Sequence, residues 1–337
     1  MVLTYGIIVF MEIGKLDNET LARLVLGRVG ARRPEVIVGP GIGEDCAVLD
    51  FGEYDCVLST DPITASASRI GSLAVHISCN DVASNGVEPL AVMLTVLLPP
   101  SVTEEEIGEI ASQADEAAKS LGVQIAGGHT EVTDAVTQPL VSATAIGRAV
   151  KRAPVRAAEP GDLIVVTKKL ALEGTAIAAL QREGDLRLFL TDEEIEHAKS
   201  LLEHISVVKE GVIAGRAGVK AMHDVTEGGV LGAVWEVCAR EGAGAEIQAA
   251  LLPFDPVTMA LCAVLDLNPM RLISSGSMLM IVSPGKKQVL FSALSEAGVD
   301  ATVIGTIEPQ DKGITLVMRN GEREVISPPG PDEIYAT

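Results

Sequence analysis

The stretch VGPGIGEDCAVLDFGEYDCVLSTDPIT, from Val38 to Thr64, joins a glycine-rich turn to two short apolar runs. The runs are CAVL and CVLST, and acidic residues stand at their ends: Glu44, Asp45, Asp55 and Asp61. Short apolar runs bounded by turn residues indicate buried strands. The glycines of GPGIG would let backbone N–H groups come close to a phosphate. The stretch therefore predicts two strands whose acidic ends lie beside an anion-binding turn.

The overall composition is that of a globular but acidic chain. Its 337 residues include 46 acidic and 26 basic side chains, for a formal net charge of −20, and 47% of them are hydrophobic. That length suggests two domains. A broad basic face for nucleic acid is not expected, and an anionic substrate would need metal ions or helix N-termini to offset the negative field.

Cysteine spacing and the first residues bear on the cellular compartment. The five cysteines form no C-x-x-C pair, which favours a reducing cytosol over a disulfide framework. The apolar segment 2–11 is only ten residues long and lacks a basic start and a small-residue cleavage site. Neither a signal peptide nor a membrane span is expected from it, so the sequence predicts a cytoplasmic protein without membrane contacts.

Apolar periodicity divides the chain into helices and strands. In the first half, helices are expected over 12–30, 69–86 and 101–122, the last with a Thr103–Glu106 capping box. The segment 88–100 is expected to be a buried strand. A basic, proline-containing segment at 148–162 marks a junction, after which helices and strands alternate again. The predicted fold is α+β with two domains, over 12–150 and 151–337.

Three acids lie at the ends of apolar elements: Asp45, Asp61 and Asp81, which are 16 and 20 residues apart. Carboxylates that converge repel each other unless a cation lies between them. Mg²⁺ is held by one or two carboxylates together with phosphate oxygens, so such a cluster suits a nucleoside triphosphate. Taken singly, each acid is better explained as a turn or cap residue, and the sequence leaves both interpretations open.

Other motifs for nucleotides and catalysis are missing. The sequence has no G-x-x-x-x-G-K-[ST] and no G-x-S-x-G, and GPGIGE leads into a strand rather than a helix. These absences argue against a P-loop, a serine hydrolase and a dinucleotide-binding fold. The five histidines show no zinc-type spacing, and His197 and His204 are expected on a surface helix.

Six motifs in a fixed order resemble the aminoimidazole-ribonucleotide-synthetase-like superfamily: GIGEDCAVL, STDPIT, NDVASNGVEPL, GGHTE, HDVTEGGVLGAV and SSGSMLMIVSP. This superfamily includes the purine-pathway synthetase, thiamine-monophosphate kinase, selenophosphate synthetase and the hydrogenase maturation protein HypE. The likeness runs from about residue 12 to the end. It implies a two-domain PurM-like α+β fold with a C-terminal α/β sandwich. It also implies a homodimer whose N-terminal domains share a β-barrel, and ATP with Mg²⁺ in a groove near that interface.

The resemblance also assigns site residues. It implies metal ligands at Asp45, Asp61 and Asp81. It implies cofactor contacts at seven further positions: Gly41, Gly43, Glu44, Asn80, Gly127, Gly128 and Thr130. Catalysis in such a site would consist mainly of positioning and charge neutralisation.

One departure from the family motif falls in GGHTE. Many members have Asp where this chain has His129, and Glu131 follows two residues later. Glu131 is a candidate to supply the missing carboxylate, and a lower metal count is the alternative. Imidazole is a poorer partner for Mg²⁺ than carboxylate, but it titrates near neutrality. His129 is therefore a candidate to act on the substrate, against a plain polar contact.

The motif HDVTEGG joins a strand end to a helix. The N-terminus of a helix that follows two glycines can bind an anion, which makes His223 and Asp224 candidate catalytic residues. The alternative is that Thr226 simply caps the helix.

The C-terminal half is most similar to the hydrogenase maturation branch. That branch ends in a cysteine that carries the group being dehydrated, whereas this chain ends PPGPDEIYAT and has no cysteine after Cys262. Thiocarboxamide-to-nitrile chemistry on a terminal thiolate is therefore not expected. The segment PDEIY is expected to form an ordered plug or a subunit contact.

The favoured function is an ATP-dependent enzyme that activates or phosphorylates a small amide- or acyl-type substrate, which a partner protein could deliver. Two alternatives remain open. One is a phosphotransferase like thiamine-monophosphate kinase, indicated by GIGEDCA and STD although the DLSDGL-type motif of that family is missing. The other is a nucleotide-binding scaffold without turnover.

Overall fold

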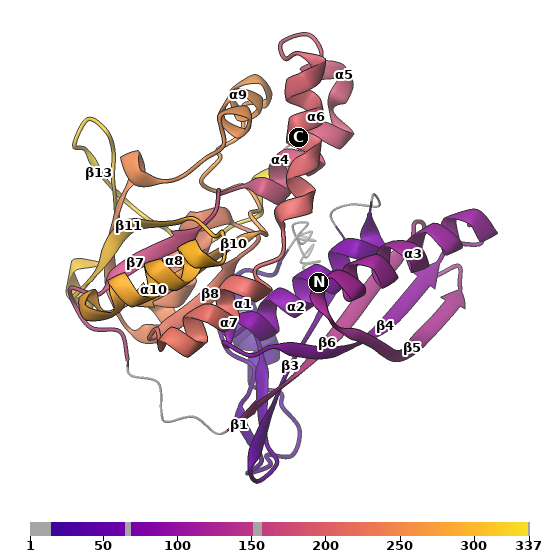
Figure 1. Cartoon of the computed structure of the whole chain (residues 1–337), viewed down its shortest axis with the longest axis horizontal. Coiled ribbons are helices and arrows are strands. Elements are labelled where there is room, and N and C mark those ends of the chain that lie inside the picture. Colours follow the sequence, from indigo (N-terminus) through magenta and orange to yellow (C-terminus); the bar gives the residue numbers. More distant parts are fainter. Residues whose placement is uncertain (1–14, 65–68, 151–156, 336–337) are drawn as a thin grey trace, which may run out of the picture.

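Two β-sheets organise the computed structural model, which describes residues 15–64, 69–150 and 157–335 (Figure 1). The apolar segment 2–11, the first residues of the helix predicted at 12–30 and part of the predicted junction lie outside the described residues. Within the described ranges, no helix is both long enough and apolar enough to cross a membrane.

The first sheet has the strand order β1-β2-β3-β6-β4-β5. Its neighbouring strands are antiparallel except for the parallel pair β4–β5. The strands are β1 (Val36–Val38), β2 (Ala47–Asp50), β3 (Tyr54–Ile63), β4 (Pro89–Leu98), β5 (Gln124–Val132) and β6 (Leu140–Val150). The two apolar runs of the opening stretch thus form the adjacent strands β2 and β3, as predicted.

Helices α2 (Ile70–Ser84) and α3 (Glu104–Leu121) cover one face of this sheet (Figure 1). Val75 and Cys79 of α2 share a buried apolar cluster with Val92 and Ala145 of the sheet. The predicted capping box of α3 is confirmed, because the Thr103 hydroxyl accepts from the Glu106 N–H and the Glu106 carboxylate accepts from the Thr103 N–H. Both helices therefore follow the predicted boundaries closely.

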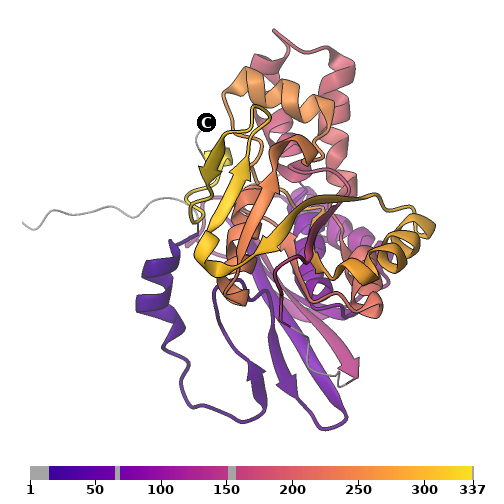
Figure 2. The ribbon, with the colours of Figure 1, turned by 90° about the vertical axis from the view of Figure 1, so that its left-hand side faces the viewer.

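The opposite face of the first sheet carries exposed apolar side chains. Leu90 and Met93 of β4 are 50% and 47% exposed. The helix predicted over 12–30 is much shorter, with α1 (Asn18–Leu21) continuing into a π-helical turn (Ala22–Leu26). Leu24 and Val25 are 43% and 48% exposed, because this segment stands off the sheet (Figure 2).

The second sheet has the strand order β13-β12-β9-β11-β7-β10-β8. It is antiparallel except for the pair β9–β12. Its strands are β7 (Leu163–Thr167), β8 (Ala221–Val225), β9 (Gly244–Gln248), β10 (Ser277–Val282), β11 (Ala301–Glu308), β12 (Ile314–Val317) and β13 (Arg323–Val325). These strands lie in the half of the chain where the sequence predicts that helices and strands alternate.

Seven helices accompany this sheet in the described part of the chain: α4 (Leu172–Gln181), α5 (Glu183–Leu186), α6 (Asp192–Ser200), α7 (Val208–Ala217), α8 (Gly229–Glu241), α9 (Pro256–Leu265) and α10 (Lys287–Glu296). Single 3₁₀ turns add 201–204, 249–251, 284–286, 310–312 and 333–335. The α+β class is confirmed, with helices and mostly antiparallel sheets in both halves.

The two halves of the chain share one apolar core. Ile70 and Leu73 of α2 belong to the same buried cluster as Leu172 and Ile177 of α4. Helix α7 also approaches α2 closely, since a Cβ at Gly211 would collide with the Ala83 carbonyl oxygen. The halves are therefore packed together, and residues from both meet at their boundary.

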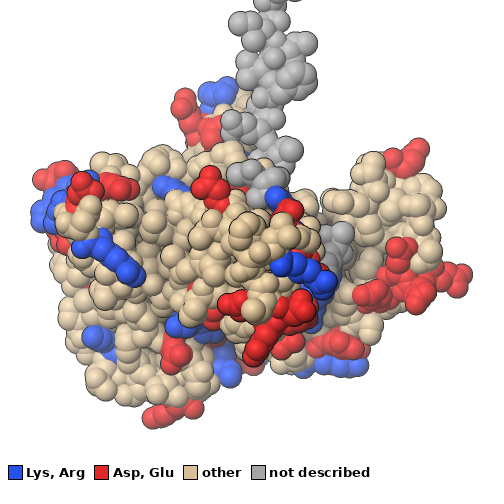
Figure 3. Space-filling view, turned by 90° about the horizontal axis from the view of Figure 1, so that it is seen from above, with Lys and Arg blue, Asp and Glu red and all other residues tan. Residues whose placement is uncertain are grey.

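Acidic and basic side chains intermingle on the face shown in Figure 3, where most of the surface is neither. On this face the blue side chains lie singly or beside red ones. The face carries no continuous basic area among its described residues, in keeping with the net charge of −20.

Candidate active site

A cavity of about 490 Å³ lies where the two halves meet, and much of the predicted site lines it. This volume is typical of a small-molecule site. The predicted residues among its walls are Gly41, Gly43, Glu44, Asp45, Asp61, Asp81, His223 and Asp224. Segments far apart in the sequence therefore converge here, as the acid pattern suggested.

Serine hydroxyls position the three predicted metal ligands. Asp61 lies on β3 and Asp81 on α2, and the Ser59 hydroxyl donates to Asp81 Oδ2 at 2.5 Å and approaches Asp61 Oδ2 at 3.5 Å. Asp45 lies just before β2, and its Oδ2 accepts from the Ser84 hydroxyl at 2.7 Å. The carboxyl groups are thus held in fixed orientations by neighbours on β3 and α2.

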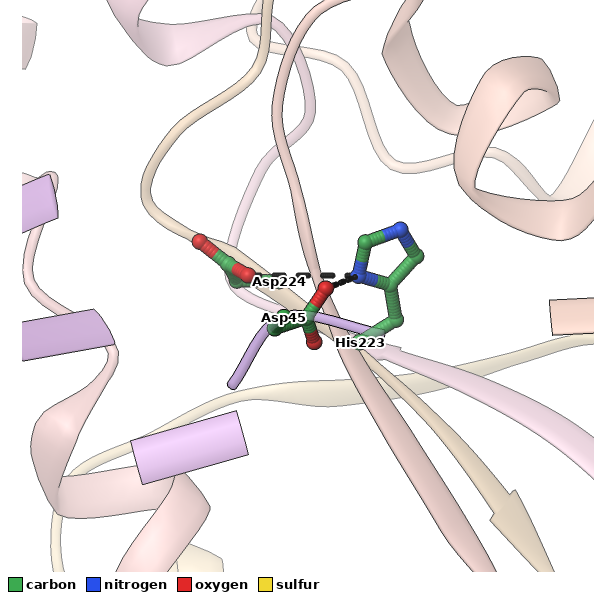
Figure 4. A group of neighbouring side chains, drawn as sticks. All are labelled: Asp45, His223 and Asp224. Atoms are coloured by element: carbon green, nitrogen blue, oxygen red, sulfur yellow. Dashed lines mark ion pairs between the residues drawn. The ribbon is translucent and has the colours of Figure 1, made fainter. Parts of the chain in front are cut away.

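His223 of β8 crosses from the second half to pair with Asp45 of the first (Figure 4). Its Nδ1 lies 2.7 Å from Asp45 Oδ1, and its Nε2 lies 2.9 Å from Glu236 Oε2 of α8. Burial by itself would lower the pKa of His223, but the two carboxylates outweigh it and raise the pKa to about 10. Both ring nitrogens face carboxylates, and the catalytic role of His223 stays a prediction. His223 is a cation that fixes Asp45.

Asp224 and Asp81 are buried acids whose negative charge the described residues compensate only in part, since His223 Nδ1 lies 3.9 Å from Asp224 Oδ1 and Lys15 lowers the pKa of Asp224. Asp224 is 1% exposed, and its Oδ2 has no hydrogen-bond partner in the described part of the chain. The pKa of Asp224 is raised to about 7, mainly by burial and next by the negative charge of Asp45. The pKa of Asp81 is raised well above its usual range, mainly by burial and next by the neighbouring acids Asp224 and Asp61. Raised carboxyl pKa values in a cavity mark a place where a cation would be bound favourably.

The donor atoms at this point are close enough for a shared metal ion. One ligand atom each from Asp45, His223 and Asp224 lie within 4.8 Å of one another. The two carboxylate oxygens suit a hard cation such as Mg²⁺, whereas the third atom is an imidazole nitrogen of His223, which is already paired with carboxylates. The unpaired Asp224 oxygen shows that the residues present fit such an ion.

The glycine-rich turn is held against α8. The Arg240 guanidinium donates to the Gly43 carbonyl oxygen at 2.7 Å. Gly43 has a φ of +73°, and a Cβ there would lie 2.8 Å from the Glu236 carbonyl oxygen. Gly43 is therefore needed for the close approach of the turn to α8, while the turn still lines the cavity.

Asn80 does not face the cavity, which corrects its predicted contact with the cofactor. It is fully buried, its side-chain Nδ2 donates to Ile205 O at 2.8 Å, and its Oδ1 accepts from Val207 N at 2.8 Å. Because both ends of the amide are used, Asn80 holds the 205–207 segment of the second half against α2.

The GGHTE segment lies away from the acid cluster in this chain, so its predicted place beside the acids is corrected. Gly127, Gly128, His129, Thr130 and Glu131 belong to β5, the edge strand of the first sheet. His129 and Glu131 are exposed and contact each other at 3.1 Å. A Cβ at Gly128 would collide with the Leu94 carbonyl oxygen, so this glycine serves strand pairing. The segment borders a second, mostly apolar hollow beside α3.

The start of α8 binds an anion that the chain itself supplies. Gly228 is the N-cap, and its N–H donates to Asp332 Oδ2 at 2.7 Å, while the Ile273 N–H donates to Asp332 Oδ1 at 3.1 Å. The predicted cap by Thr226 is wrong, because no side chain caps this helix. The PDEIY segment is thus an ordered plug on its own chain, and the preceding Pro329 and Gly330 line the cavity.

Three further acids in the cavity wall were not predicted as site residues: Glu173, Glu227 and Glu236. Glu236 pairs with His223, and Glu173 is buried at the start of α4. Each of these two is a lone acid within an apolar run, in LGAVWEV and KLALEGTAIAAL. Since a charged residue is rarely buried without a reason, that pattern was the available signal.

Family models match both halves of the chain. Residues 43–149 match the N-terminal domain of AIR synthase related protein, and residues 159–317 match its C-terminal domain. The chain is 28% identical over 327 residues to a putative hydrogenase expression/formation protein of Methanocaldococcus jannaschii, covering 94% of this chain and 95% of the relative. It is 28% identical over 314 residues to the carbamoyl dehydratase HypE of Rhodobacter capsulatus, and the match covers 90% of this chain and 84% of the relative. It is 32% identical over 223 residues to the thiamine-monophosphate kinase of Methanospirillum hungatei, and the match covers 63% of this chain and 71% of the relative.

Solved structures share the fold. HypE in a HypE–HypF complex superposes with a TM-score of 0.72 at 22% identity, covering 86% of this chain and 94% of that one. HypE in complex with ATP superposes with a TM-score of 0.67 at 20% identity, and the match covers 95% of this chain and 94% of that one. AaThiL complexed with AMPPCP and TMP superposes with a TM-score of 0.73 at 17% identity, and the match covers 96% of this chain and 99% of that one. By the two matched models and this common fold, the chain belongs to the AIR synthase related protein family, the PurM-like superfamily that includes HypE.

Proposed function

We propose that this protein is an ATP-dependent enzyme that binds ATP with Mg²⁺ in the interdomain cavity and activates or phosphorylates a small amide- or acyl-type substrate. The observation that carries the proposal is the meeting of Asp61, Asp81 and Asp224 in one cavity, with an unpaired buried oxygen on Asp224. Uncompensated buried carboxylates are costly unless a cation is bound.

Different residues of the chain would bind the metal ion and the phosphates of such a ligand. Asp61, Asp81 and Asp224 would hold the metal ion, while Asp45 is already compensated by His223. Mg²⁺, when bound, supplies positive charge that offsets the charge of the phosphates. The turn at Gly41 and Gly43 lines the same cavity and presents backbone N–H groups. Ser59 and Ser84 keep the carboxyl groups oriented.

The relatives support this proposal at the level of the family. HypE is a carbamoyl dehydratase with a structure in complex with ATP, and AaThiL has a structure with AMPPCP and TMP. The likeness to thiamine-monophosphate kinase favours a phosphotransferase as the second candidate function, since that relative is 32% identical over 223 residues. HypE forms a complex with HypF, and by analogy we propose that a partner protein delivers the substrate to this chain.

Calorimetry with AMPPCP and Mg²⁺ tests the proposal. Wild-type protein should bind AMPPCP only when Mg²⁺ is present, and Asp61→Asn and Asp224→Asn should weaken this binding at least about tenfold, the loss of one charged ligand. Asp115→Asn, an exposed acid on α3, is the matched control and should bind as the wild type. Absence of Mg²⁺-dependent binding in the wild type would refute the site.

A turnover assay separates the enzyme from a scaffold. ATP consumption by the purified protein, screened against a metabolite library, should rise with at least one amide or phosphate-accepting compound. Tight binding of AMPPCP with no ATP consumption under any condition would favour the non-catalytic scaffold instead.

We further propose that the protein is a cytoplasmic homodimer that pairs through the exposed face of its first sheet. Leu90 and Met93 are half-exposed on that face, and β5 is an unpaired edge strand. A second copy packed there would bury these side chains and place His129 and Glu131 near the subunit interface. Light scattering should give twice the chain mass of 35.1 kDa, and Met93→Lys should shift it to the monomer. A wild-type monomer at micromolar concentration would rule out this arrangement.

A further inference from the structure

Glu173 is a buried carboxyl group that the acid cluster does not use. It lies in the first turn of α4, is 2% exposed and lines the same cavity as Asp61 and Asp81. Neither its Oε2 nor the Ser275 Oγ, which lines the cavity as well, makes an aligned hydrogen bond among the described residues, although Ser275 lies close enough to lower the pKa of Glu173. Buried polar atoms in folded proteins are nearly always paired. These two atoms are therefore available to a ligand in the cavity.

The backbone around Glu173 is fixed against the segment that carries Ser275. The Gly174 N–H donates to Ile273 O at 3.0 Å, and the Ala171 N–H donates to Ser274 Oγ at 2.7 Å. A Cβ at Gly174 would lie 2.8 Å from the Ile273 carbonyl oxygen, so glycine allows this close approach. The carboxyl and hydroxyl groups are thus held in position before a ligand arrives.

The charges around Glu173 select the kind of ligand. Burial raises the pKa of Glu173 to about 7, with Ser275 acting against it and Asp332 and Glu227 adding to it. Lys15 is the sole Lys or Arg among the described residues that line the cavity, and the main causes of the Glu173 pKa shift include no basic group. An anionic group would be repelled here, whereas a group with N–H donors would be bound.

We propose that Glu173 and Ser275 bind the nitrogen-bearing group of the substrate, a primary amide or amidine whose N–H donates to the Glu173 carboxyl. This inference rests on the proposed function, because it names the group of the amide-type substrate that the cavity holds. The Ser275 hydroxyl both donates and accepts, so it completes the contact with the carbonyl or the second nitrogen. Glu173 is then the residue that separates amides from the corresponding acids.

Three probes of the same shape test this assignment: acetamide, acetamidine and acetate. Full-length protein is titrated with each, with and without AMPPCP and Mg²⁺, and binding is followed by saturation-transfer NMR. Acetamide and acetamidine should give a signal and acetate should give none. Glu173→Leu, which removes the acceptor, should weaken both at least about tenfold. Equal binding of acetate, no binding of any probe, or unchanged binding in Glu173→Leu overturns the proposal.

A stability comparison excludes a purely structural role. Glu210 is a second buried glutamate, but it is paired with Lys168 at 2.8 Å and does not line the cavity. Glu173→Gln should leave Tm unchanged or raise it, because it removes a buried carboxyl group that makes no ion pair among the described residues. Glu210→Gln should lower Tm, because it removes the ion pair with Lys168, and should leave the preference among the probes unchanged. An equal fall in Tm for both variants would show that Glu173 has a structural partner, and would overturn the proposal.

The two proposals fail in different ways. If the wild type binds no AMPPCP but still prefers acetamide over acetate, the ATP site is refuted and the role of Glu173 is supported. If AMPPCP binds with Mg²⁺ but acetate and acetamide bind alike, the ATP site is supported and the role of Glu173 is refuted.

Discussion

Replacing Asn80 by alanine should destabilise the protein without removing a ligand contact. The Asn80 amide is fully buried and makes two hydrogen bonds of 2.8 Å to the backbone at Ile205 and Val207. Alanine leaves one buried carbonyl and one buried N–H without a partner. Each unsatisfied buried group costs about 1–3 kcal/mol. The expected loss in the free energy of unfolding is therefore about 3 kcal/mol.

Urea unfolding and calorimetry together decide the role of Asn80. The midpoint in urea should fall for Asn80→Ala and stay unchanged for Asn320→Ala, an exposed asparagine in the turn between β12 and β13. Below the unfolding transition, affinity for AMPPCP with Mg²⁺ should change by less than about threefold, which is under 1 kcal/mol. A tenfold loss of affinity with unchanged stability would refute this reasoning and restore the cofactor contact implied by the family motif.

Three further predictions concern the cavity and its supports. Gly43→Ala should lower the free energy of unfolding by more than about 1 kcal/mol more than Gly52→Ala does. Both glycines have a positive φ, but only at Gly43 would the added Cβ collide with another part of the backbone. Thermal denaturation of both variants measures this difference. Asp332→Ala should lower stability by about 2 kcal/mol and speed limited proteolysis of the C-terminal segment, since it leaves the buried Gly228 and Ile273 N–H groups without acceptors. Burial raises the pKa of Glu173 from 4.5 to about 7, so the folded protein keeps a proton that the unfolded chain has lost, and wild type should lose about 3 kcal/mol relative to Glu173→Gln as pH rises from 4.5 to 7. Urea unfolding across that range checks the last expectation, and parallel stability curves for the two proteins would contradict it.

The sequence predicted the secondary structure well where local signals act alone. Strands β2, β3 and β4 and helices α2 and α3 lie where apolar runs, glycines and the Thr103 cap placed them. The helix at 12–30 was the clear failure, because in the described residues the α-helix spans only Asn18–Leu21 and the apolar Leu24 and Val25 stay exposed. Periodicity reports that a face is apolar and says nothing of what covers it.

The candidate site was predicted in part, and the errors share one cause. Asp61, Asp81 and Asp224 lie in one cavity, but Asn80 turns into the interdomain packing and His129 lies on the edge strand. Spacing along the chain cannot distinguish a side chain that faces a cavity from its neighbour that faces the core. Glu173 and Glu236 were missed for the converse reason, since they stand in apolar runs that indicate packing rather than chemistry.

The division of the acids into paired and unpaired groups follows from where the two halves meet. Asp45 is buried beside His223, which is itself held by Glu236, so a cation from the second half compensates the first acid. Asp61, Asp81 and Asp224 are compensated less well: His223 Nδ1 lies 3.9 Å from Asp224 Oδ1 and Lys15 lines the same cavity, yet burial and the neighbouring acids still raise the pKa values of Asp81 and Asp224. A further cation is therefore more favourable at these three than at Asp45. Because the His223–Asp45 and Arg240–Gly43 contacts join the halves, the contacts that stabilise the domain arrangement also fix the geometry of the site.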